Sequence, residues 1–332
     1  MQSLKAVNDF VVKFANVNGS GSASANGLFA KAVLRMGVPI AARNIFPSNI
    51  QGLPTWYEVR VSGEGWIGRR GGVDLMVAMN PQTWDQDVKS LEPGGYLFYD
   101  NSKAIPQDRF REDINVIGAP LTEICAAAFP DPKQRQLLKN ICYVGVLSHL
   151  INLDVEVIKN LINEEFGDKQ KLIASNMKAL QLGRDYAQKH LQPLGLRLEN
   201  ADMVGDRIFI DGNTAAGIGA VYGGATVCAW YPITPSTSLA EAYEKYCKKF
   251  RTDKETGEKK YAFVQAEDEI ASIGMVLGAG WAGARAFTCT SGPGVSLMNE
   301  FIGLSYFAEI PAVIFDVQRG GPSTGKIGRA HV

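Results

Sequence analysis

The chain has 332 residues, of which 46% are hydrophobic, and this composition is ample for two folded domains. Its 34 Lys and Arg residues balance its 34 Asp and Glu residues, so no net charge favours a nucleic acid or an anionic membrane as partner. The five cysteines form no Cys-x-x-Cys pair and show no metal spacing, so we expect reduced thiols in a cytoplasmic protein and no iron–sulfur ligands here.

The first half begins with an α/β pattern. We predict a strand at residues 9–17, a loop rich in glycine and serine at 18–27, and an amphipathic helix at 28–36. Such a loop can cradle a phosphate, and it can also be a tight turn that packs the helix on the sheet. The match to Gly-x-Gly-x-x-Gly fails at Ser24, yet an NAD-dependent Rossmann oxidoreductase stays open as an alternative.

The rest of the first half continues with strands and helices. Strands are predicted at residues 58–62, 74–79 and 94–100, and helices at 155–166 and 172–190, which together complete a doubly wound domain. The segment 43–54 has loop composition and is interpreted as a subunit contact. His149 and His190 have no partner that suggests catalysis, and we interpret them as a core residue and a helix-end residue.

Four apolar runs in the second half predict a parallel sheet with one functional edge. These runs lie at residues 225–230, 261–265, 286–290 and 312–317, and each is followed by polar or glycine-rich sequence. The segment 213–240 contains no charge, but glycines and prolines interrupt it, so we interpret it as buried sheet and not as a membrane span.

The loop after the first of these strands contains a candidate ligand-binding residue. Pro232 and Pro235 flank Ile233 and Thr234 and are expected to hold them extended. Thr234 would then lie at the carboxyl end of a strand, where open α/β sheets bind ligands. Ser236 or Thr237 can cap a helix that starts near residue 239.

Three carboxylates follow the second strand at the start of a helix predicted for residues 270–284. Glu267 and Asp268 suit the positive end of a helix dipole, and that interpretation is as good as a functional one. Glu269 differs because the small residues that follow it let a cofactor or another backbone come close. We therefore expect the Glu269 carboxylate to be drawn inward.

Five motifs, in order and spacing, resemble the α subunit of 2-oxoacid:ferredoxin oxidoreductases, and the 2-oxoglutarate type most. The first half resembles the γ domain that is fused ahead of α in that class. The motifs are Gly-Asn-Thr-Ala-Ala-Gly at 212–217, Tyr-Pro-Ile-Thr-Pro-Ser at 231–236, Gln-Ala-Glu-Asp-Glu at 265–269, Thr-Ser-Gly-Pro-Gly at 290–294, and Asp-Val-Gln-Arg-Gly-Gly-Pro-Ser-Thr-Gly at 316–325.

The resemblance implies oxidative decarboxylation of a 2-oxoacid on thiamine diphosphate, with electrons passed to ferredoxin and the acyl group to coenzyme A. By matching positions, Glu269 would hydrogen-bond the thiamine pyrimidine, and Thr234 and Arg319 would hold the substrate carboxylate. In the resembled family a separate β subunit carries Mg²⁺ and the nearest [4Fe-4S] cluster.

The pocket wall and the domain organisation are also implied by the resemblance. Tyr231, Pro232 and Ile233 would shape the pocket. The implied fold is α/β: an N-terminal doubly wound γ-type domain is followed by an incomplete, parallel α/β domain of the pyrimidine-binding type. The expected bounds are 1–190 for the γ-type domain, 191–205 for a linker, 206–325 for the α domain and 326–332 for a non-native tail that includes His331.

Two other classes stay open beside this enzyme subunit. One is the NAD-dependent oxidoreductase already mentioned. The other is a non-catalytic α/β assembly subunit whose motifs serve interfaces. The preferred 2-oxoacid stays open as well, since 2-oxoglutarate and pyruvate differ at a distal carboxylate for which the sequence offers no identifiable partner.

Overall fold

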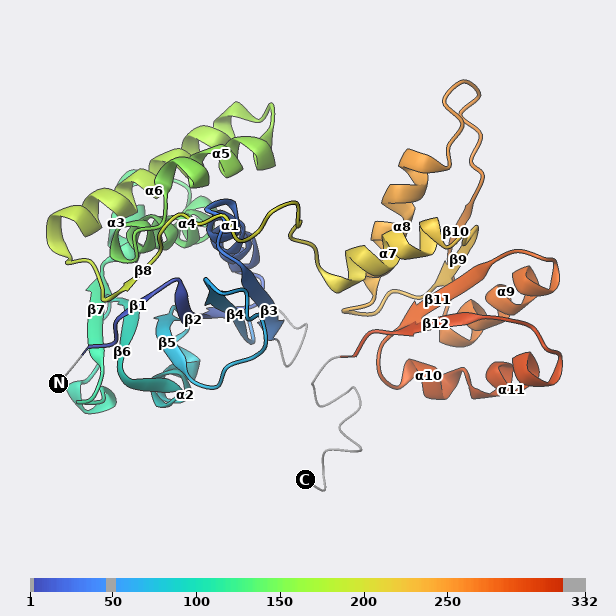
Figure 1. The fold of residues 1–332 in the computed structure, drawn as a ribbon, viewed down its shortest axis with the longest axis horizontal. Helices are drawn as coiled ribbons and strands as arrows, with labels where there is room; N and C mark the ends of the chain where they lie inside the picture. The colour runs from blue at the N-terminus through green and yellow to red at the C-terminus, as the bar shows by residue number, and fades with distance from the viewer. Residues whose placement is uncertain (1–2, 46–51, 319–332) are drawn as a thin grey trace. The chain divides into compact units, whose positions relative to one another are not determined.

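The computed structural model describes residues 3–45 and 52–318 and divides the chain into two compact units, Met1–Phe209 and Ile210–Val332 (Figure 1). Each unit has its own hydrophobic core and its own main sheet, so each is described by itself.

The main sheet of the first unit has six strands in the order β3-β4-β2-β5-β6-β7. Strands β2, β5, β6 and β7 are parallel, whereas β4 runs antiparallel to both β2 and β3. The predicted α/β fold with a mainly parallel sheet is confirmed, and the antiparallel direction of β4 is a feature that the sequence did not predict. The strands are β1 (Ala6–Val7), β2 (Asp9–Val17), β3 (Ile40–Ile45), β4 (Pro54–Ser62), β5 (Val73–Ala78), β6 (Leu91–Asp100), β7 (Asn115–Ala119) and β8 (Leu196–Arg197).

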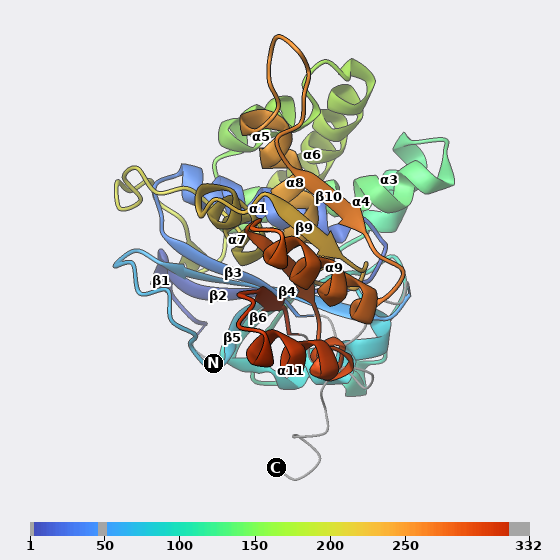
Figure 2. The same ribbon diagram turned by 90° about the vertical axis from the view of Figure 1, so that its right-hand side faces the viewer.

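Most helices of this unit gather on one face of the sheet (Figures 1 and 2). They are α1 (Ser22–Arg35), α3 (Leu121–Ala128), α4 (Pro132–Leu150), α5 (Val155–Phe166) and α6 (Gln170–His190). The short helix α2 (Trp84–Lys89) packs on the other face, and the 3₁₀ turns Pro81–Thr83 and Gln107–Arg109 lie in loops.

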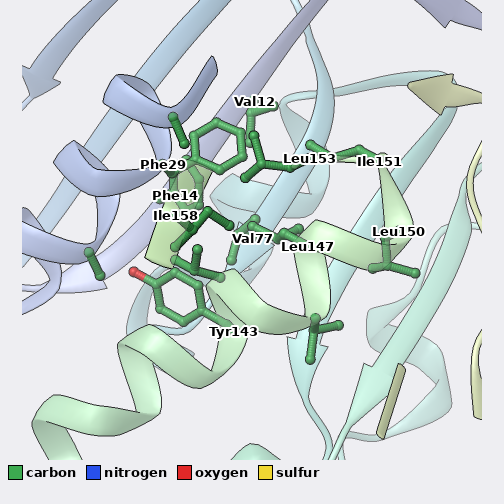
Figure 3. Packing of buried hydrophobic residues seen from close by; sticks show 14 of the residues in the cluster. Val12, Phe14, Phe29, Val77, Tyr143, Leu147, Leu150, Ile151, Leu153 and Ile158 are labelled. Carbon is green, nitrogen blue, oxygen red and sulfur yellow. The ribbon is translucent and has the colours of Figure 1, made fainter. Parts of the chain in front are cut away.

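The main core of the first unit forms between the sheet and these helices (Figure 3). Phe14 of β2 meets Phe29 of α1 edge-on with ring centroids 5.1 Å apart, and Tyr143 of α4 lies beside them. The Tyr143 hydroxyl donates a 2.6 Å hydrogen bond to Asn26 Oδ1, which satisfies it inside the core. Each such side chain stabilises the fold by about 1.5–3 kcal/mol through burial.

Two predictions for the first unit differ from the structure. Helix α1 begins at Ser22 and not at residue 28, because Gly21 turns the chain with φ 78° directly ahead of it. The segment 191–205, expected as a linker, packs on the first unit. Its strand β8 pairs with β1, and Leu196 and Leu198 are buried in the core.

The second unit is a four-stranded parallel sheet in the order β10-β9-β11-β12. Helices α7 and α8 cover one face, and α9 and α11 cover the other (Figure 1). The strands are β9 (Val227–Trp230), β10 (Ala262–Gln265), β11 (Ala286–Thr290) and β12 (Val313–Asp316), and the helices are α7 (Gly212–Tyr222), α8 (Thr237–Phe250), α9 (Glu269–Trp281), α10 (Gly294–Leu297) and α11 (Asn299–Phe307).

Helix α7 corrects the interpretation of the charge-free segment as sheet. Asp211 begins this helix by accepting a 2.9 Å hydrogen bond from the Thr214 N–H. A Cβ on Gly217 would lie 2.9 Å from Ala242 Cβ, so the small residues of α7 serve its close packing on α8. The small, uncharged residues at the start of the charge-free segment therefore form a helix that packs on another helix, and not a strand of the sheet.

Candidate functional site

The four strands of the second unit end level with one another at one edge of the sheet. Because all four are parallel, the loops that follow them start side by side. The backbone pairing continues one residue beyond the strands, with hydrogen bonds of 2.8 Å from Ala266 N to Trp230 O and from Val317 N to Thr290 O. The pairs in register are Gln265 with Trp230, Phe287 with Cys228, and Thr290 with Asp316.

The strand order makes the connections diverge at this edge between β9 and β11. The chain leaves β9 toward α8 on one face of the sheet, and it leaves β11 toward α10 and α11, of which α11 packs on the opposite face. Neighbouring strands whose connections diverge in this way form a topological switch point, which is where open α/β sheets bind ligands. The loop that contains Thr234 and the loop 291–294 border this point.

The loop after β9 is fixed by hydrogen bonds from α7 and from within the loop itself. Asn213 of α7 donates 2.8 Å hydrogen bonds to the Pro235 carbonyl and to Ser238 Oγ. The buried Ser236 hydroxyl donates to the Ile233 carbonyl at 2.8 Å. The sequence did not assign a role to Asn213, and its place in the first motif was the only signal for one.

Thr234 lies at the turn of this fixed loop and is half-buried. The peptide bond between Thr234 and Pro235 is cis, and the turn 234–236 leads directly into α8. No hydrogen bond of the described residues uses the Thr234 hydroxyl. Tyr231 and Ile233 are half-buried as well, whereas Pro232 is exposed. Like Thr234, Tyr231 makes no side-chain hydrogen bond among the described residues, so the loop offers two hydroxyls beside partly apolar walls.

The three carboxylates after β10 differ in their surroundings. Asp268 caps α9 by accepting a 2.6 Å hydrogen bond from the Ala271 N–H, and both it and Glu267 are exposed. Glu269 is the first residue of α9, is half-buried, and takes part in no ion pair or hydrogen bond of the described residues. The structure therefore separates a capping carboxylate from an unpaired one.

Glu269 lies against the loop that follows β11. A Cβ on Gly294 would lie 2.0 Å from Thr290 Oγ1 and 3.2 Å from Glu269 Cγ, so only glycine fits between the two side chains. The hydroxyls of Thr290 and Ser291 are buried without a hydrogen-bond partner among the described residues. Leaving a buried polar group without a hydrogen bond costs about 1–3 kcal/mol. Such unpaired groups are therefore rare in folded proteins and are typical of sites where a ligand binds.

Cys289 lies behind this edge as a structural residue. Burial raises the pKa of its thiol to about 11, so it stays protonated at neutral pH. Its Sγ lies 3.6 Å from the Ser236 carbonyl, to which it donates. A protonated thiol is a poor nucleophile, so Cys289 supports the loop after β9 and does not react.

The structure places five of the six predicted site residues at the same edge of the sheet. Thr234, Tyr231, Pro232 and Ile233 belong to the loop after β9, and Glu269 follows the neighbouring strand β10. Arg319 lies outside the described residues, three positions after the end of β12.

The glycine-rich loop of the first unit is packed on one side by α4, while Ala23, Ser24 and Gly27 line a cavity of about 1290 Å³. Asn140 of α4 donates a 2.8 Å hydrogen bond to the Ser20 carbonyl. A Cβ on Gly21 would lie 2.4 Å from Leu137 Cδ2, so α4 packs directly on this turn. This packing explains the tight turn at Gly21 that precedes α1.

Three further observations concern other classes of site. Within residues 3–45 and 52–318, no group of three or more His, Cys, Asp or Glu side chains could hold a metal ion. In the same ranges, no helix combines the length and the hydropathy needed to cross a membrane. His149 Nε2 lies 3.2 Å from the Leu191 carbonyl, and the His190 ring packs on Tyr186, so neither belongs to a catalytic arrangement.

Comparisons with known families place both units in one group. Residues 11–186 match the family model for pyruvate ferredoxin/flavodoxin oxidoreductase. The chain belongs to this pyruvate ferredoxin/flavodoxin oxidoreductase family. Residues 218–332 match the model described as its thiamine diphosphate-binding part. The family assignment covers both units, including the edge that holds Thr234 and Glu269.

Individual relatives agree with the family. A 2-oxoacid:ferredoxin oxidoreductase α subunit from Aeropyrum pernix is 30% identical over 92% of this chain and 54% of its own length. A 2-oxoglutarate synthase subunit from Methanocaldococcus jannaschii is 48% identical over 36% of this chain and 30% of its own. The chain thus spans about half the length of the former relative.

A solved structure shares the fold of nearly the whole chain. It is the 2-oxoglutarate:ferredoxin oxidoreductase from Magnetococcus marinus with 2-oxoglutarate, coenzyme A and succinyl-CoA bound. The identity is 32% and the TM-score is 0.80, with 96% of this chain and 54% of the other covered.

Proposed function

We propose that this chain provides the γ-type and pyrimidine-binding portions of a 2-oxoacid:ferredoxin oxidoreductase whose substrate is 2-oxoglutarate. The complex would oxidatively decarboxylate the 2-oxoacid to its acyl-CoA and pass the electrons to ferredoxin. The observation that carries the proposal is Glu269 beside Gly294, at the same sheet edge as Thr234. Among residues 3–45 and 52–318, neither the Glu269 carboxylate nor the Thr234 hydroxyl has a partner.

The residues at this edge fit thiamine diphosphate. Bound thiamine diphosphate supplies the carbanion chemistry that decarboxylation of a 2-oxoacid needs. A half-buried carboxylate without an ion pair suits the pyrimidine ring of thiamine, because it can hold a proton shared with a ring nitrogen. In the proposal Glu269 Oε makes that hydrogen bond, and the buried hydroxyls of Thr290 and Ser291 support the polar environment around it.

Thr234 is proposed to bind the substrate carboxylate. Its hydroxyl is free, and the bonds from Asn213 and Ser236 fix the loop that carries it, so little entropy is lost on binding. Arg319 is proposed to bind the same carboxylate, since a guanidinium can hydrogen-bond both oxygens at once. Tyr231, Pro232 and Ile233 would form the wall of the pocket and exclude water.

The remaining components are proposed to lie on partners. A β subunit would carry Mg²⁺, the thiamine diphosphate phosphates and a [4Fe-4S] cluster, and ferredoxin would accept the electrons. Coenzyme A would act as co-substrate, in agreement with the ligands named for the structure from Magnetococcus marinus. Such a complex is expected to work in the cytoplasm.

The test uses Glu269→Gln in the full complex with its β subunit. We expect the variant to assemble normally and to slow exchange of the thiamine C2 proton about 10²- to 10⁴-fold, since a proton relay is lost. Exchange is followed by NMR, and Glu267→Gln serves as the matched control from the exposed part of the same turn. Exchange at the wild-type rate in Glu269→Gln would contradict the proposal.

A further inference from the structure

Thr290 is a buried hydroxyl side chain at the end of β11 that the resemblance assigns to no role. It is 1% exposed, and its Oγ1 has no hydrogen-bond partner among the described residues. Gly294 lies between this oxygen and Glu269 Cγ, at distances that leave no room for a Cβ. The unpaired hydroxyl of Thr290 and the unpaired carboxylate of Glu269 therefore meet at one glycine.

We propose that Thr290 is a positioning residue whose hydroxyl donates a hydrogen bond to the Glu269 carboxylate when the cofactor is bound. The proposal rests on the proposed function. The carboxylate oxygens of Glu269 are two bonds beyond Cγ, so rotation about the last side-chain bonds brings one of them within reach of Thr290 Oγ1. The second oxygen then stays available to the cofactor.

The packing around Gly294 explains why this arrangement is specific. Thr290 is fixed by the sheet, because it pairs with Asp316 of β12 and its carbonyl accepts a 2.8 Å hydrogen bond from the Val317 N–H. Glu269 is fixed at its backbone by the first turn of α9, which Asp268 caps. Only the side chain of Glu269 is still free to rotate, and a hydrogen bond from Thr290 would hold it in one conformation.

Thr288 provides a matched control. It lies on the same face of β11 two residues earlier, is completely buried, and its hydroxyl is also without a partner among the described residues. Side chains two apart in a strand share a face, but the position of Thr288 is about 6–7 Å further from the sheet edge. Replacing either threonine by valine removes one hydroxyl and preserves shape.

The experiment measures thiamine C2 proton exchange and thiamine diphosphate affinity in the full complex. We expect Thr290→Val to slow exchange about 10- to 100-fold, the effect of one hydrogen bond to a charged group. Thr290→Ser should restore the rate, and Thr288→Val should leave it unchanged. Affinity measured by calorimetry should change little in Thr290→Val, because the hydroxyl contacts the glutamate and not the ring.

A double variant separates this inference from the proposed function. If Thr290 acts through Glu269, then Thr290→Val should add nothing to the slower exchange of Glu269→Gln. Slow exchange in Glu269→Gln with a wild-type rate in Thr290→Val would overturn the role of Thr290 alone. Equal losses in Thr290→Val and Thr290→Ser, or additive losses in the double variant, would also overturn it. A wild-type rate in Glu269→Gln would overturn both proposals.

Discussion

The hydroxyl of Thr234 is the proposed contact to the substrate carboxylate, and its removal should weaken substrate binding. Replacing Thr234 by alanine in the full complex should raise KM for the 2-oxoacid about 10- to 100-fold, because a hydrogen bond to a charged group contributes about 1.5–3 kcal/mol. Thiamine diphosphate affinity should stay unchanged. Steady-state kinetics check the expectation, and Thr237→Ala in the first turn of α8 is the control. Unchanged KM in Thr234→Ala would remove this residue from the substrate site.

Asp100 of the first unit contributes to the pH dependence of stability. Burial alone would raise the pKa of its carboxyl, but hydrogen bonds from Thr122 and Ser102 and the charge of Lys139 outweigh burial and lower it. A carboxylate whose pKa is lower in the folded state stabilises the fold above the unfolded pKa of about 4 and loses that contribution as the pH falls.

Acid unfolding tests this effect. The free energy of unfolding of the wild type should fall as the pH decreases from about 5 toward 2, and Asp100→Asn should reduce that slope. Denaturant titrations monitored by circular dichroism at several pH values give the measurement. Asp108→Asn, at an exposed carboxyl in the turn Gln107–Arg109, should keep the wild-type slope. Equal slopes for wild type and Asp100→Asn would refute the assignment.

Sequence could single out individual site residues only where their neighbours in the chain constrain them. Prolines marked the Thr234 loop, and small residues after Glu269 distinguished it from Glu267 and Asp268, in agreement with its greater burial. Asn213 acts on Pro235, 22 positions later, and Thr290 lies near Glu269, 21 positions earlier. No local sequence pattern reveals contacts between residues so far apart in the chain.

Among the elements, the predicted strands agree with the structure to within a few residues because apolar runs define them directly. The expected burial holds for β9 and β11, whereas β10 and β12 are partly exposed. The start of α1 was missed because the small, polar residues after Gly21 have no clear helical period. Strand β8 was missed because two residues are too short to show alternation. The antiparallel β3–β4 edge depends on a connection that local sequence does not determine.

The contact between α4 and α6 depends on two glycines. A Cβ on Gly183 would lie 1.9 Å from the Cys142 carbonyl oxygen, and one on Gly145 would lie 2.1 Å from the Leu180 carbonyl oxygen. Gly183→Ala should therefore lower the free energy of unfolding by about 1–3 kcal/mol through overpacking. Gly27→Ala in α1 has open space and should raise it by about 0.5–1 kcal/mol. Thermal unfolding of both variants checks the signs, and stabilisation by Gly183→Ala would contradict this packing.

At the scale of the whole molecule, the end of the first unit can be tested by truncation. A chain that ends at Phe209 keeps Leu196 and Leu198, whereas one that ends at His190 loses both. Because each buried leucine contributes about 1.5–3 kcal/mol, the shorter chain should unfold at a lower denaturant concentration. Urea titrations of the two chains make the comparison. Equal midpoints would mean that 191–205 is a linker after all.

The four strands of the second unit end at the same level, and this determines where the chain can gain or lose residues without disturbing the site. Adding or removing a residue within β9 would shift Thr234 by about 3.3 Å and turn the strand's side chains to the opposite faces. The same change in the exposed 251–260 connection leaves all four strand ends where they are. Over evolution, length differences among relatives should therefore accumulate far from this edge, and differences in substrate choice should arise by replacement of single side chains at constant strand length.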